Sequence, residues 1–115
     1  MAIGALGALA QETRLQIFRL LVEEGPEGLP AGRIAERIGL PGPTLSFHLQ
    51  QMKQAGLVTC RRESRSLIYA ADFTTMNALV AYLTENCCRR TGAVCVPAPV
   101  CEARPAKLRT RRAQS

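Results

Sequence analysis

Three cysteines stand close together near the end of the sequence, in the stretch ENCCRRTGAVC at residues 85–95. Cys87 and Cys88 are adjacent, and Cys95 follows a glycine-containing segment that is long enough to fold back on the pair. Thiolates are soft ligands and bind soft, thiophilic metals and metalloids. The spacing therefore predicts a site in which three sulfurs from one chain converge on a single soft centre.

Three other interpretations of these cysteines stay open. A Cys87–Cys88 bridge would be strained, because neighbouring Cα atoms lie about 3.8 Å apart and disulfides usually need roughly 4.4–6.8 Å. A Cys88–Cys95 bridge is easier and would make the stretch a redox sensor. Structural zinc would need a fourth ligand such as Cys101, and zinc sites favour gaps of two to four residues over an adjacent pair. Packing of Cys87 on an apolar face would explain one thiol but not three.

The number of cysteines and the first residues of the sequence indicate the cellular compartment in which the protein is expected. The cysteines number five, which is odd, and the apolar opening at 1–10 is too short for a signal segment or a membrane span. We therefore expect a cytoplasmic, reducing location, where clustered thiols indicate metal or redox chemistry. An enzyme is not expected, since there is no Cys-x-x-Cys pair, no anion-binding loop and no parallel-sheet pattern.

The formal charge of +6 is unevenly distributed. Acidic and basic side chains balance over residues 1–88, whereas residues 89–115 hold seven basic groups against Glu102 alone. The stretch 102–115 is typical of a disordered basic tail. Within the balanced part, one local cluster is positive and indicates where nucleic acid would bind: Lys53, Arg61, Arg62 and Arg65.

Hydrophobic periodicity predicts a mainly α chain with one β-hairpin. The expected elements are helices at 3–10, 12–23, 31–38 and about 43–55, a hairpin at 57–72 and a last helix at 73–88, with a loop at 24–30. Leu15, Phe18 and Leu21 share a stripe on the second helix. Two short helices joined by a Gly/Pro turn and followed by a hairpin are the pattern of a winged helix-turn-helix.

The helix at 43–55 is predicted to be the DNA-reading helix. Leu45, Leu49 and Met52 would face inward and leave a polar face free, whose hydroxyl and amide groups can read base edges in the major groove. The arginines of the hairpin tip would lie along the DNA backbone or in a minor groove. The predicted DNA contacts are Pro43, Thr44, Ser46, Phe47, Gln50 and Gln51 on the helix and Arg61, Arg62 and Arg65 on the hairpin.

Three stretches resemble the ArsR (ArsR/SmtB) family of metalloregulatory repressors: LAQETRLQIFRLL at 9–21, IAERIGLPGPTLSFHLQQMKQAGLV at 34–58 and RRESRSLIYA at 61–70. The resemblance spans about residues 6–88 and implies a homodimeric winged-helix repressor that leaves its operator when a metal or metalloid binds. It matches His48 to the family's histidine, whose role here would be either to contact DNA or to pack at the edge of the helix. The first and last helices normally build the dimer in this family, which here implies Leu6, Leu9, Met76, Leu79, Val80 and Leu83.

The resemblance also implies where an inducer would bind. Some arsenic sensors of the family carry a Cys-x-Val-Cys motif before the reading helix, but the corresponding residues 32–40 of this sequence hold no cysteine. Zinc and nickel sensors of the family use Asp and His pairs on the last helix, but in this sequence that helix has no histidine and Glu85 is its sole acid. What remains is similar to an arsenite-responsive subgroup with an NCC stretch. Trivalent arsenic and antimony favour three sulfurs in a pyramid, so we expect either to act as inducer through Cys87, Cys88 and Cys95.

These interpretations combine into one expected organisation. Residues 1–88 would form the DNA-binding and dimerisation domain, 87–101 the inducer-binding segment and 102–115 the tail. The partners would be operator DNA and a second copy of the chain, without a membrane, and DNA binding would need no cofactor. A methylarsenical would require only two sulfurs, while thiol redox sensing and zinc-responsive repression remain the alternatives. Cys60 is expected to be a small, partly buried residue of the hairpin.

Overall fold

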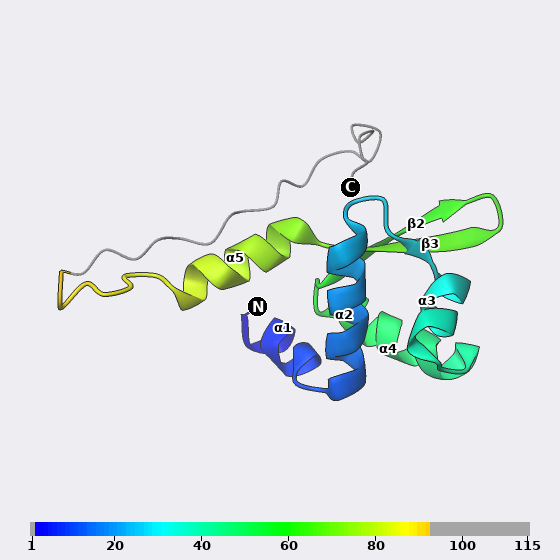
Figure 1. Ribbon diagram of the computed structural model, residues 1–115, viewed down its shortest axis with the longest axis horizontal. Helices are drawn as coiled ribbons and strands as arrows, with labels where there is room; N and C mark the ends of the chain where they lie inside the picture. The colour runs from blue at the N-terminus through cyan, green and yellow to red at the C-terminus, as the bar shows by residue number, and fades with distance from the viewer. Residues whose placement is uncertain (1, 93–115) are drawn as a thin grey trace.

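The computed structural model describes residues 2–92 and leaves Met1 and residues 93–115 outside the described part. Its elements are α1 (Ala2–Leu9), α2 (Glu12–Glu24), β1 (Leu29–Pro30), α3 (Ala31–Ile38), α4 (Gly42–Gln54), β2 (Val58–Glu63), β3 (Ser66–Ala71) and α5 (Phe73–Leu83). Figure 1 shows α2, α3 and α4 gathered together, the β2–β3 hairpin reaching out on one side and α5 on the other. The predicted mainly α fold with a hairpin is confirmed. No helix in the described part is long and apolar enough to cross a membrane.

The hydrophobic core lies between α2, α3, α4 and the base of the hairpin. Its largest fully buried side chains are Ile17, Leu21, Ile34, Leu45, Leu49, Met52 and Leu57. The prediction that Leu45, Leu49 and Met52 face inward is thus confirmed. The prediction that Leu15 belongs to the apolar stripe of α2 is wrong. Its side chain is 43% exposed, because it lies about 160° around the helix from the buried Ile17.

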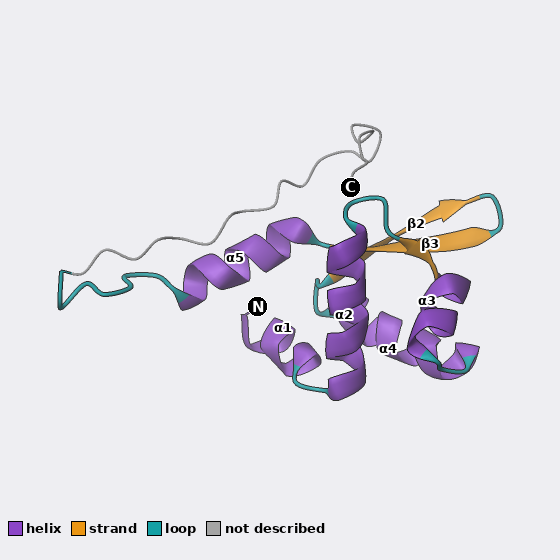
Figure 2. Cartoon of the chain, in the orientation of Figure 1, coloured by secondary structure: helices purple, strands orange, loops and turns teal. Residues whose placement is uncertain are grey.

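A short strand before α3 was predicted to be a loop. Leu29 and Pro30 pair antiparallel with Tyr69 and Ile68, so the hairpin is part of a three-stranded sheet in the order β1-β3-β2 (Figure 2). Gly28 makes this pairing possible. Its φ is 72°, and a Cβ there would overlap the backbone oxygen and carbon of Tyr69.

We expect the substitution Gly28→Ala to destabilise the domain by about 2–5 kcal/mol, because it adds left-handed strain to a clash with backbone that cannot move aside. Thermal unfolding should show a Tm at least ~10 °C lower. Gly39→Ala is the matched control: φ there is 83°, but nothing lies within 4 Å of the added Cβ. A control that costs as much as Gly28→Ala would contradict the role of the close approach.

The last helix is shorter than the predicted span of 73–88. It begins after Asp72, whose side chain accepts a hydrogen bond from the Thr75 N–H (3.1 Å), and ends at Leu83. The Thr84 hydroxyl donates to the Val80 carbonyl (2.9 Å), and such side-chain bonds compete with the helical ladder. Asn86 and Cys88 then adopt φ values of 62° and 60°, which break the helical path. The sequence pattern missed this end, since apolar spacing continues to Cys87.

Candidate functional site

The turn between α3 and α4 sets the orientation of the reading helix. Gly39 ends α3 in the left-handed region, with φ 83°, and its N–H donates to the Ala35 carbonyl at 2.8 Å. Pro41 precedes the first turn of α4, and its carbonyl accepts from the Leu45 N–H at 3.0 Å. The predicted glycine stop of α3 and the Pro/Gly turn are therefore both present.

The α4 side chains opposite the core point into solvent. Leu45, Leu49 and Met52 are buried, so the remaining positions of the helix form one continuous exposed face. Six of the seven helix residues predicted to contact DNA are exposed on it: Pro43, Thr44, Ser46, Phe47, Gln50 and Gln51. α4 thus has the packing of a helix whose outer surface is available to a major groove.

His48 is the exception, because it is half-buried. Its Nδ1 lies 3.3 Å from Nη1 of Arg14 on α2. A guanidinium can only donate, so Nδ1 is the acceptor in this contact. Arg14 also donates from Nε to the Ala8 carbonyl of α1 at 2.8 Å. The sequence patterns missed Arg14 as the residue that holds the reading helix, since the two side chains are 34 positions apart.

The hairpin carries three predicted arginines, which differ in their partners. Arg61 donates to the Glu63 carboxylate at 2.8 Å and to the Glu27 carbonyl at 3.0 Å. Arg62 and Arg65 are exposed, near a two-residue tip in which Ser64 has φ 55°. Because Glu63 compensates the charge of Arg61, the positive charge that the hairpin offers to a phosphate backbone comes from Arg62 and Arg65.

We expect Arg62→Ala to lower operator affinity for all sequences alike and to reduce the slope of log affinity against log salt by about one. Arg61→Ala should change that slope less, since its charge is already compensated. Fluorescence anisotropy of a labelled duplex at several salt concentrations measures both. Equal slope changes for the two variants would contradict the assignment of different roles.

The predicted dimer residues fall into two groups. Leu6, Val80 and Leu83 are exposed to 39%, 46% and 58%. Leu9, Met76 and Leu79 pack partly against the core, so they connect the surface of α1 and α5 to the body. Ile3, which is 83% exposed, precedes Leu6 by three positions and so shares its face of the helix.

Two of the three predicted metal ligands lie side by side. The sulfurs of Cys87 and Cys88 are 3.6 Å apart, in the turns that follow α5 rather than on its last helical turn as predicted. This separation is far beyond the roughly 2.05 Å of a disulfide. Cys95 and Cys101 lie outside the described residues. Within residues 2–92 no group of three His, Cys, Asp or Glu side chains is close enough to hold a metal.

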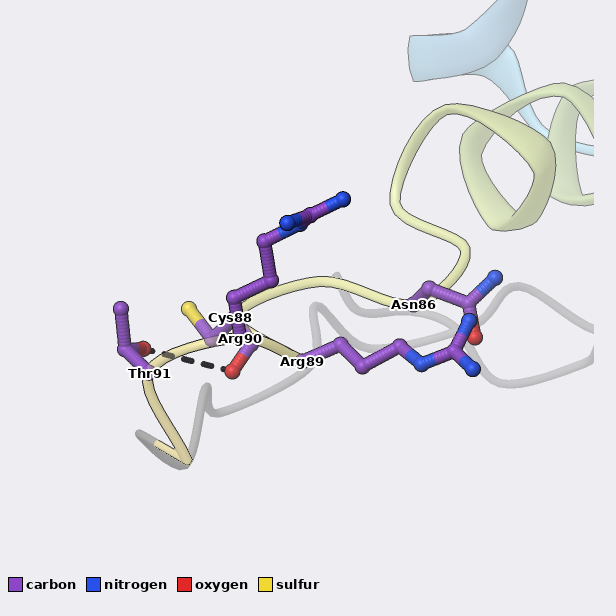
Figure 3. A pocket seen from close by; sticks show the side chains of 5 residues that line it. All are labelled: Asn86, Cys88, Arg89, Arg90 and Thr91. Carbon is purple, nitrogen blue, oxygen red and sulfur yellow. Dashed lines mark hydrogen bonds between the residues drawn. The ribbon is translucent and has the colours of Figure 1, made fainter.

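A shallow pocket of about 320 Å³ lies at the same turn, lined by Asn86, Cys88, Arg89, Arg90 and Thr91. Figure 3 shows the Cys88 sulfur between the Thr91 side chain and the arginines, with the Thr91 hydroxyl donating to the Cys88 carbonyl. That hydrogen bond is 3.3 Å long, and the Gly92 N–H donates to the same carbonyl at 3.0 Å. The backbone after the cysteine pair therefore turns back towards it.

Cys60 is remote from this pair. It pairs with Tyr69 across β2 and β3, and Figure 1 shows that hairpin and the residues after α5 on opposite sides of the helices. Burial raises the pKa of the Tyr69 phenol, and its hydrogen bond to Cys60 raises that pKa further. The half-buried Cys60 thus contributes to the sheet, in agreement with its expected position.

The architecture and its exposed reading helix define a winged helix-turn-helix DNA-binding regulator of transcription. A helix-turn-helix domain family matches residues 9–61. The transcriptional activator HlyU of Vibrio cholerae is 32% identical over 88 residues, which cover 76% of this chain and 79% of HlyU. The solved structure of HlyU has a TM-score of 0.61 and covers 76% of this chain and 91% of its own.

Two further relatives place the chain within that class. The homodimeric winged helix-turn-helix domain of Mb0332 from Mycobacterium bovis, described provisionally as an ArsR-family regulator, is 32% identical with a TM-score of 0.58, over 74% of this chain and 79% of its own. A Halobacterium salinarum protein, provisionally named as the arsenical resistance operon repressor ArsR, is 34% identical over 76% of this chain and 65% of its own. The chain belongs to the ArsR family.

Proposed function

We propose that this protein is a homodimeric repressor that leaves its operator when trivalent arsenic binds to Cys87, Cys88 and Cys95. The observation that carries the proposal is the 3.6 Å separation of the Cys87 and Cys88 sulfurs. With metal–sulfur bonds of about 2.3 Å, that distance corresponds to a sulfur–metal–sulfur angle of about 100°. The pair is thus spaced as two ligands of one central atom, arsenite or antimonite, or of a methylarsenical that needs only two sulfurs.

The backbone after the pair supports a third ligand from the same chain. Thr91 and Gly92 both donate to the Cys88 carbonyl, so the chain reverses before it continues to Cys95. The guanidinium groups of Arg89 and Arg90 line the same pocket as Cys88 and place positive charge beside the cysteine pair.

The position of the pair also suggests how binding reaches DNA. The cysteines follow α5, whose exposed Val80 and Leu83 suit contact with a second copy. Closing three sulfurs on arsenic would reorder the end of this helix and change the spacing of the two reading helices. A hundredfold loss of operator affinity requires a coupling free energy of about 2.7 kcal/mol. Because a repressor must reach its operator DNA, we expect the protein to act in the cytoplasm.

Titration of arsenite into a complex of the protein with its operator tests the proposal. We expect dissociation at sub-millimolar arsenite, followed by fluorescence anisotropy, and three sulfur neighbours around arsenic in the X-ray absorption spectrum. A complex that persists throughout the titration would refute the proposal. Zinc in place of arsenite gives the comparison for a zinc-responsive repressor, which would need further ligands beyond the cysteine pair.

Thiol oxidation is the second candidate, and the exposure of Cys87 favours it. One solved structure of the relative HlyU is that of its reduced form. Treatment of the operator complex with a mild oxidant, without arsenite, separates the two candidates. Release together with loss of two hydrogen masses would support redox sensing through a Cys88–Cys95 bridge.

A further inference from the structure

Phe47 occupies the centre of the exposed face of α4. At about 100° per residue, it lies about 160° around the helix axis from Leu45 and from Leu49, which are both buried. Its side chain is 59% exposed, while Thr44, Ser46 and the glutamines on the same side are polar. The residue of the reading helix that faces directly away from Leu45 and Leu49 is therefore an aromatic ring without any hydrogen-bonding group.

The ring is also held in a defined position. His48 contacts it edge to face, with ring centroids 5.8 Å apart and an interplanar angle of 64°. His48 is held in turn by Arg14, whose Nε donates to the Ala8 carbonyl and whose backbone N–H donates to the side-chain oxygen of Gln11. A series of contacts thus runs from the end of α1 through α2 to Phe47. Aromatic pairs of this kind restrict ring orientation, which makes the ring suited to selective contact.

We propose that Phe47 determines operator specificity by packing against the 5-methyl group of thymine in the major groove. This inference rests on the proposed DNA-binding role of the exposed α4 face. Among base edges in that groove, the thymine methyl is the apolar group, whereas the other positions are hydrogen-bond donors and acceptors. A ring that cannot donate or accept would leave those groups unpaired. Wedging between bases is typical of minor-groove binding, where a helix of this kind does not fit.

Deoxyuridine provides the direct test, since it pairs like thymidine but lacks the methyl group. An operator is first obtained by selection from random duplexes with the full-length protein, and each thymine of a half-site is then replaced singly. For the wild-type protein we expect one position at which the replacement lowers affinity about fourfold, the effect of one buried methyl group. With Phe47→Ala the same replacement should have no effect, and with Phe47→Leu it should retain part of the effect.

The outcomes separate this inference from the function on which it rests. Methyl dependence that is unchanged in Phe47→Ala, or absent from the wild-type protein bound to its operator, overturns the role of Phe47. Gln50→Ala serves as the comparison on the same face: it should weaken binding and leave the methyl dependence in place. If neither Gln50→Ala nor Phe47→Ala changes affinity, the DNA-binding face of α4 itself is refuted.

Discussion

Cys95→Ser is expected to bind operator DNA as tightly as the unmodified protein and to need at least a hundredfold more arsenite for release. The reason is the number of sulfur ligands. Without the Cys95 sulfur, arsenic would be bound only by Cys87 and Cys88 and would lose its third arsenic–sulfur bond. Operator affinity should not change, because the reading helix and hairpin are far from this turn (Figure 1). Anisotropy titrations with and without arsenite measure both quantities.

Two comparisons make this experiment specific. Cys60→Ser is the matched control, since Cys60 lies in β2 opposite Tyr69 and should leave release unchanged. A methylarsenical should still release Cys95→Ser but fail with Cys88→Ser, because two sulfurs are sufficient for it and the close pair would be lost. Undiminished release of Cys95→Ser by arsenite would refute the three-cysteine site.

The double substitution Val80→Glu with Leu83→Glu is expected to produce a monomer whose operator affinity is about 10²–10⁴-fold lower. These side chains are 46% and 58% exposed on α5, and in a symmetric interface each new carboxylate would be desolvated near its own copy. A monomer binds one half-site and loses the effective concentration that links two reading helices. Analytical ultracentrifugation and anisotropy give the two measurements.

Leu67→Glu is the control for the oligomeric state, because Leu67 is a comparably exposed apolar residue (40%) on the hairpin. This variant should remain a dimer, although its added charge would weaken DNA binding through the hairpin. If the α5 double variant stays dimeric, the interface lies elsewhere and the proposed coupling from the cysteine pair through α5 is wrong.

The elements of the DNA-binding unit could be predicted from sequence because each is encoded by local signals. The spacing of Leu45, Leu49 and Met52 defines both the buried side of α4 and, as its complement, the exposed side. Gly39 marks the end of α3, since a left-handed residue is needed there. The hairpin follows from two β-rich segments around a short polar tip. All of these signals lie within a few residues of the structure that they specify.

The failures of prediction have two origins: contacts between segments far apart in the chain, and local hydrogen bonds and backbone angles that apolar spacing does not show. β1 has only two residues and shows no hydrophobic periodicity. It forms because it pairs with β3, which the backbone can approach closely at Gly28. The end of α5 was placed too late, because the apolar spacing continues although Thr84 and Asn86 turn the backbone away. The environment of Arg61 depends on the nearby Glu63 carboxylate and also on the Glu27 carbonyl, which is distant along the chain.

The sequence by itself determined the type of protein and predicted the helix whose outer face is exposed, because residue type and short-range spacing specify these; the roles of that face in DNA binding and of the cysteines in inducer binding are proposals. The tertiary structure decided which of those residues are held and which are available. It brought the Cys87 and Cys88 sulfurs to 3.6 Å through left-handed turns, and it tied His48 to Arg14. Such contacts depend on backbone geometry and on segments far apart in the chain, which no local pattern encodes.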